Sequence, residues 1–181
     1  MSAVLISVKP EECLRIAEGK QTVLVQKTFP KESSTPFKVY VYCTMGNVPQ
    51  YIYNENLEKE SIYTNHPDII NGRVICEFMC DEITDIHYHE EAGGYGVAMS
   101  HPLCDFFAES TCLKYKELHD YLKGNTGYGW HTSDLVVYDK PKDLSEFKVW
   151  VENKVWSYPK KIEKPPRSWR YVEELKEMQH A

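Results

Sequence analysis

Residues 3–25 read AVLISVKPEECLRIAEGKQTVLV and contain the first three predicted elements of the chain. Residues 3–8 are a short apolar run, which predicts a buried strand. Pro10 suits the first turn of a helix, because its missing N–H costs little there, and Gly19 suits the end of that helix. Residues 22–25 are rich in β-branched side chains and predict a second strand. The chain therefore opens with a strand, a helix and a strand.

The same signals predict further elements downstream. Strand-forming residues dominate at 37–44, 73–80, 135–138 and 169–172. A helix capped by Ser110 or Thr111 is predicted to end at Gly124, and a single helical turn is predicted after Asp143. Segment 45–72 is expected to be a long, partly irregular excursion, 88–101 is expected to be a loop, and 127–131 is expected to be a tight aromatic turn. This order predicts one α+β domain: residues 1–147 form a small mixed or antiparallel β-barrel with flanking helices, and 148–181 complete the barrel or pack on it.

The composition describes a folded protein with an uneven distribution of charge. Of the 181 residues, 42% are hydrophobic and 27% are charged, which excludes wholesale disorder. The sequence has no apolar run of membrane-spanning length and no signal peptide, so a cytoplasmic protein is expected. Residues 41–138 carry 5 basic and 15 acidic side chains, whereas residues 148–170 carry 7 basic and 2 acidic ones. A protein of net charge −6 can therefore still present a basic face to an anionic ligand.

No cofactor or metal is predicted. The six cysteines form no tight framework, and in a chain of this length without a secretion signal we expect them to be reduced. His87 and His89 could share one face of a strand, but their spacing to His101 and Cys104 matches no established zinc pattern. The glycine-rich segment 93–96 lacks the lysine and the strand–helix context of a phosphate-binding loop.

Three stretches of the sequence together resemble ASCH domains, which belong to the PUA-like superfamily. They are residues 5–11 with the helix after them and 19–22, the strand at 72–78, and a tail made of 127–135 and 165–172. The tail resembles a subgroup that is common in phages and prophages of Gram-positive bacteria. The resemblance implies a small PUA-like (ASCH) barrel that binds RNA or a modified nucleoside or nucleotide.

The sequence departs from the family at the motif linked to catalysis. Many ASCH domains have G-x-K-x-x-E-x-R where the first helix meets the second strand. Here Gly19 is kept, but the Lys, Glu and Arg positions hold Gln21, Leu24 and Gln26. In members described as amidohydrolases on acetylated cytidine, the lysine is taken as the nucleophile or base. An amide can do neither job, so the departure predicts a degenerate catalytic site.

The predicted ligand cleft lies between residues 19–25, the strand that carries Glu77, and the loop that carries Trp130 and His131. Trp130 either stacks on a base there or plugs the end of the barrel. Lys20 and Glu77 are the catalytic residues if the protein is instead an active amidohydrolase or ribonuclease. The residues predicted to bind RNA or a nucleotide are Gln21, Gln26, Tyr42, Thr44, Tyr128, Trp130, His131, Ser133, Arg167 and Arg170.

Two further surfaces leave alternatives open. Between residues 148 and 170, Trp150, Trp156, Tyr158 and Trp169 interleave with lysines and arginines. This pattern suits single-stranded nucleic acid, unless the tryptophans pack back onto the barrel. The acidic middle section is either a solvated face or a surface for a basic protein, in which case the protein is a phage-type inhibitor of a host defence protein. A protein is thus the alternative partner to RNA, and no membrane partner is expected.

Overall fold

The computed structural model describes residues 2–45, 50–53, 59–62, 69–89, 94–97, 105–152 and 156–175. The helical elements are α1 (Pro10–Ala17), α2 (Asp105–Thr111), α3 (Tyr115–Leu122) and the short 3-10 helix η1 (Leu144–Glu146). The first strands are β1 (Ser2–Val8), β2 (Val23–Gln26), β3 (Phe37–Cys43), β4 (Gln50–Tyr53), β5 (Lys59–Ile62), β6 (Val74–Cys80) and β7 (Ile83–His89). The later strands are β8 (Gly94–Val97), β9 (Gly127–His131), β10 (Ser133–Lys142), β11 (Lys148–Glu152), β12 (Ser157–Lys161) and β13 (Trp169–Glu173).

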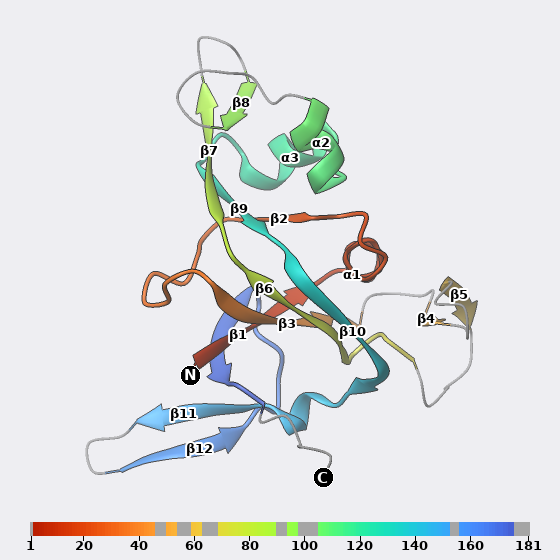
Figure 1. Cartoon of the computed structure of the whole chain (residues 1–181), viewed down its shortest axis with the longest axis vertical. Coiled ribbons are helices and arrows are strands. Elements are labelled where there is room, and N and C mark those ends of the chain that lie inside the picture. Colours follow the sequence, from red (N-terminus) through yellow and green to blue (C-terminus); the bar gives the residue numbers. More distant parts are fainter. Residues whose placement is uncertain are drawn as a thin grey trace.

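Two sheets carry most of the fold (Figure 1). The larger sheet has the strand order β10-β6-β3-β1-β13, in which β1 and β3 are parallel and the other pairs are antiparallel. The smaller sheet has the order β2-β9-β7-β8 and is antiparallel throughout. Two separate hairpins, β4–β5 and β11–β12, complete the described strands.

A bent ribbon of two paired chain segments joins the two sheets. Strand β6 runs into β7 through residues 81–82, and β9 runs into β10 through residue 132. Because β6 pairs with β10 and β7 pairs with β9, both segments cross from one sheet to the other at the same place. The backbone N–H of His131 donates to the carbonyl of Glu82 over 2.9 Å at this bend. The ribbon therefore fixes how the sheets face each other.

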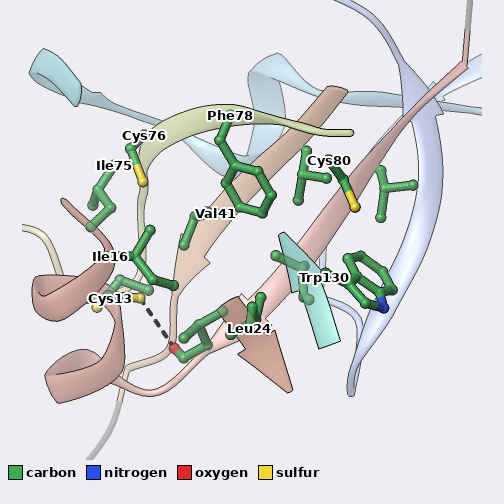
Figure 2. Close-up of a cluster of buried hydrophobic side chains, with 14 of the residues drawn as sticks. Cys13, Ile16, Leu24, Val41, Ile75, Cys76, Phe78, Cys80 and Trp130 are labelled. Carbon is green, nitrogen blue, oxygen red and sulfur yellow. Dashed lines mark hydrogen bonds between the residues drawn. The ribbon is translucent and has the colours of Figure 1, made fainter. Parts of the chain in front are cut away.

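The main hydrophobic core lies between the two sheets and α1. The helix contributes Cys13, Leu14 and Ile16, and it ends where Gly19 adopts a φ of +69°. Leu24 of β2 and Trp130 of β9 enter the core from the smaller sheet, and both are fully buried (Figure 2). Trp130 lies 5.7 Å from Phe37 and 6.1 Å from Trp169, measured between ring centroids.

A second core covers the opposite face of the larger sheet. Leu5 and Tyr40 point to this side and pack with Phe147 after η1 and with Val149 of β11. Ile162, just after β12, closes the same cluster. Leu144, Phe147, Val149 and Ile162 thus attach this part of the chain to the sheet, while the β11–β12 hairpin extends to one side (Figure 1).

The α+β class is confirmed, but the strand pairing differs from the predicted closed barrel. Among the described residues, hydrogen bonds between strands define four sheets, and continuity between the main two runs through the bent ribbon. None of the described helices has the length and apolar character to cross a membrane.

Several local predictions were wrong. The helix expected after Ser110 or Thr111 begins later, as α3 at Tyr115, because Ser110 and Thr111 form the end of the preceding helix α2; residues 112–114, with a φ of 53° at Cys112, separate the two helices. The expected turn at 127–131 is the strand β9. The expected loop at 88–101 contains the end of β7 and all of β8, whereas the partly irregular segment 45–72 includes the β4–β5 hairpin.

Candidate functional site

Gln21, at the position of the family lysine, is buried in a closed hydrogen-bond network after α1. Its amide nitrogen donates to the Glu12 carboxylate over 3.0 Å and to the Val23 carbonyl over 3.3 Å. Its amide oxygen accepts from Nε of Arg15 over 3.3 Å. Both N–H groups of the amide are therefore used within the protein, and the side chain is held as part of the fold.

The charges beside Gln21 belong to that network. Burial raises the pKa of Glu12 above its ordinary value, while the hydrogen bond from Gln21 and the charges of Arg15 and Lys9 oppose the rise. Burial, together with the charge of Glu12, also raises the pKa of Tyr121 on α3. Lys20, one residue away, has a side chain that is 68% exposed and forms an ion pair with Glu18 at 2.8 Å. Lys20 therefore lies outside the network that holds Gln21.

The other two motif positions face the interior. Leu24 is fully buried, and its partner on β9 is Trp130. Gln26 is also buried, and its amide oxygen accepts from the Ser168 hydroxyl over 3.2 Å. Strand β2 thus presents Leu24 and Gln26 to packing partners.

Glu77 lies on the opposite face of the larger sheet from this motif. Its neighbours along β6, Cys76 and Phe78, belong to the main core with Leu24, whereas its cross-strand partner Tyr40 belongs to the second core. Glu77 and the motif positions therefore do not share one cleft.

The Glu77 carboxylate is already neutralised by neighbouring side chains. It accepts a hydrogen bond from the Tyr138 hydroxyl and forms an ion pair with Lys38 at 3.1 Å. Lys38 also reaches Glu174, at 3.3 Å. Burial and the hydrogen bond to Glu77 raise the pKa of Tyr138, and burial raises the pKa of Tyr40 to about 12. The contacts of Glu77 with Lys38 and Tyr138 link β3, β6 and β10.

His131 and Ser133 meet Asp81 at the bend of the ribbon. The Nδ1 atom of His131 lies 2.6 Å from Oδ1 of Asp81, and this hydrogen bond holds the pKa of Asp81 below its usual value. The His131 side chain is 43% exposed. The Ser133 hydroxyl donates to the Met79 carbonyl over 3.0 Å. Of the predicted binding residues, His131 and Ser133 are thus brought together.

The remaining predicted residues are dispersed. Tyr42 is buried in the second core, Thr44 is partly exposed after β3, and Tyr128 packs on Phe29 with 4.7 Å between ring centroids. Arg167 and Arg170 are exposed near β13. Trp130 is fully buried, and the ring nitrogen Nε1 is a buried side-chain polar atom without a partner among the described residues. Trp130 therefore plugs the core, and neither face of its ring is open to stack on a base.

The C-terminal aromatic residues divide into two groups. Trp169 packs on Trp130 and Tyr171, and its ring N–H donates to Thr28 over 2.9 Å. By contrast, Trp150 is 58% exposed and Trp156 72% exposed, and Tyr158 is also exposed. These three belong to the β11–β12 hairpin or adjoin it. Sequence reasoning singled out these aromatic residues but did not place them on two paired strands.

The similarity of this chain to known proteins is found by comparing structures and not by comparing sequences. No family model and no curated protein sequence matches the chain. ASCH from Zymomonas mobilis has a similar crystal structure, with a TM-score of 0.56 and 15% identity over 94% of this chain and 87% of that one. A serine-to-alanine variant of that protein gives 0.57 and 15% over 94% and 88%, and a tyrosine-to-phenylalanine variant gives 0.51 and 14% over 94% and 90%. The chain therefore has the fold of an ASCH protein, in agreement with the resemblance found in its sequence.

Proposed function

We propose that this protein is a non-catalytic ASCH-type, PUA-like protein that binds RNA or a modified nucleotide in the cytoplasm and belongs to the phage- and prophage-associated group. The fold similarity and the sequence resemblance support the binding class. The observation that carries the loss of catalysis is the network around Gln21, in which a neutral amide replaces the family lysine and spends its hydrogen bonds on Glu12, Arg15 and Val23.

Catalysis would need a titratable group aimed at a ligand, and the motif positions supply none. Leu24 cannot transfer a proton, and the amides of Gln21 and Gln26 neither titrate nor attack a carbonyl. An amidohydrolase or ribonuclease that uses Lys20 and Glu77 would need both side chains at one site. Lys20 is exposed and paired with Glu18, whereas Glu77 is paired with Lys38 on the far face of the larger sheet. The geometry therefore favours binding over turnover.

A protein-directed inhibitor remains the second hypothesis. It depends on the acidic middle section, whose Glu55, Glu58, Glu90 and Glu91 lie outside the described residues. A stable complex with a host protein that weakens as salt rises would support this hypothesis.

The test measures binding and turnover on one panel of ligands: single-stranded RNA, single-stranded DNA, cytidine and N4-acetylcytidine. We expect the wild type to bind RNA or one of the nucleosides and to turn none of them over. A Gln21→Lys/Gln26→Arg variant shows whether restoring two family charges restores turnover; Leu24 stays unchanged because it is in the core. Turnover by the wild type that is lost in Lys20→Ala would overturn the non-catalytic assignment. Equal binding to a neutral control polymer would overturn the binding class.

A further inference from the structure

The β11–β12 hairpin presents an aromatic side chain on the face turned away from the protein. Val149 and Val151 pack toward the second core, and because side chains alternate along a strand, Trp150 between them points outward. Its side chain is 58% exposed. A ring this exposed keeps more than half of its surface accessible to a ligand.

The residues beside Trp150 give this face a positively charged end and a negatively charged end. Trp150 pairs across the hairpin with Pro159, so two flat apolar groups lie side by side. Lys148 and Lys161 pair with each other two positions along, about 7 Å away at the usual rise of a strand. Glu152 lies at the other end of the same face. A ligand that stacks on the indole would therefore direct negative charge toward the lysine pair.

The two lysines are available for an external anion. Lys160, next to Lys161, is engaged by Glu163 at 3.5 Å. Across the part of the chain that the structure describes, no ion pair engages Lys148 or Lys161, and both are exposed. The surrounding segment 148–170 carries 7 basic and 2 acidic side chains in a protein of net charge −6. A polyanion is attracted to this segment and repelled by the acidic middle section.

We propose that the β11–β12 hairpin is the docking surface for single-stranded RNA, with Trp150 stacking on an unpaired base and with Lys148 and Lys161 contacting the adjacent phosphates. This inference rests on the proposed function and names the surface that performs it. Exposed aromatic rings beside cations are the combination that binds single strands, because every base offers a flat face and every linkage a negative charge. Tyr158 pairs with Val151 and therefore lies on the other face of the hairpin, so Trp150 is the ring that this surface presents. A duplex keeps its bases stacked on each other, so it binds this surface less tightly.

The test is fluorescence anisotropy of a labelled, unstructured RNA of about twelve nucleotides, titrated with the full chain over a series of salt concentrations. We expect Trp150→Ala to weaken binding by roughly 5- to 150-fold, the range of one lost base stack of about 1–3 kcal/mol, and Trp150→Tyr to restore most of it. Log K falls as log salt rises, and Lys148→Ser/Lys161→Ser is expected to make this fall shallower by about 1.4 in slope, because two single-strand phosphate contacts are lost. Lys116→Ser/Lys140→Ser removes the same charge from other exposed positions and is the matched control.

The outcomes separate the hairpin from the proposed function. Wild-type binding that Trp150→Ala and the Lys148/Lys161 variant leave unchanged overturns the hairpin assignment and keeps the RNA-binding function. No wild-type binding to RNA or nucleosides overturns both. A change in oligomeric state in Trp150→Ala, measured by sedimentation, with unchanged RNA affinity assigns the hairpin to contacts between copies of the chain and also overturns the inference.

Discussion

Replacing Gln21 with leucine tests whether the amide at the family lysine position is part of the fold. Leucine has a similar volume, so the buried site stays filled while the three hydrogen bonds to Glu12, Arg15 and Val23 are lost. Bonds to charged groups contribute about 1.5–3 kcal/mol each and a neutral one about 0.5–1.5. Water at the partly exposed Glu12 and Arg15 replaces some of this, so we expect the free energy of unfolding to fall by about 2–3 kcal/mol.

Urea denaturation followed by far-UV circular dichroism measures this loss. For a slope near 2 kcal/mol per molar urea, the midpoint falls by roughly 1–1.5 M. Lys20→Ala is the adjacent control: its side chain is 68% exposed and its only described ion pair is with Glu18, so the midpoint is expected to change by less than about 0.3 M. The loss in Gln21→Leu should also be smaller at acid pH, because protonated Glu12 depends less on the amide donor.

Unfolding of Gln21→Leu at the same urea concentration as the wild type would contradict a structural role for the amide. The amide would then contribute nothing to the fold, and its two N–H groups would be free for a ligand. In that case Gln21 returns to the binding site that the sequence predicted, and the non-catalytic assignment loses its main support.

Three further outcomes are expected. Burial raises the pKa of Glu12, so its contribution to stability is present below the ordinary value of 4.5 and is lost as pH rises through the folded-state pKa. The urea midpoint of Glu12→Gln should therefore increase relative to that of the wild type as pH rises from 4 to 8. A difference between the two midpoints that stays constant with pH would contradict this sign. Trp130→Ala is expected to cost about 3–5 kcal/mol, and the exposed Trp150→Ala less than about 0.5, in the same urea assay; equal losses would contradict the burial of Trp130. In a Cys104→Ser background, one thiol, Cys112, should react with an alkylating reagent in the native protein, because the other described thiols are buried; mass spectrometry showing more than one adduct before denaturation would disagree.

Local sequence signals predicted the elements whose formation depends on near neighbours. The opening strand–helix–strand unit appears as β1, α1 and β2, because an apolar run, Pro10 and Gly19 define its limits. The single turn after Asp143 is η1, where the Asp143 carboxylate accepts from the backbone N–H of Ser145 over 2.9 Å. In both places the residues that decide the structure are close in sequence.

The errors occurred where distant packing determines the conformation. Thr111 was expected to cap a helix, but its hydroxyl donates back to the Phe107 carbonyl over 2.9 Å and ends α2 instead. Gly127 and Gly129 were expected to form a turn. In β9 a Cβ at Gly127 would lie 2.7 Å from Leu122, and one at Gly129 would lie 2.9 Å from Val23. These glycines permit close packing in a strand, which the sequence of 127–131 alone does not reveal.

The sequence predicted which side chains occupy the motif positions, but not which of the predicted site residues lie close together. The motif comparison identified Gln21, Leu24 and Gln26 as uncharged replacements, and the structure locates all three in packed surroundings. Alternation along β6 separates Glu77 from Cys76 and Phe78, and the regular pairing with β3 leaves Glu77 opposite Tyr40. Which of the two faces meets α1 and β2 depends on packing between elements that are distant in sequence, and no local pattern reports it.

Because β1 pairs with β13, the larger sheet can be completed only late in the synthesis of the chain. Ser2 lies opposite Glu173, so the larger sheet gains its fifth strand only after nearly all of the described chain has been translated. At about 5–20 residues per second, the outer edge of β1 stays uncovered for roughly 10–30 s on the ribosome. An apolar strand with open hydrogen-bonding groups is a template for aggregation over that interval. The edge of β1 is therefore more open to pairing with other chains during synthesis than in the folded protein.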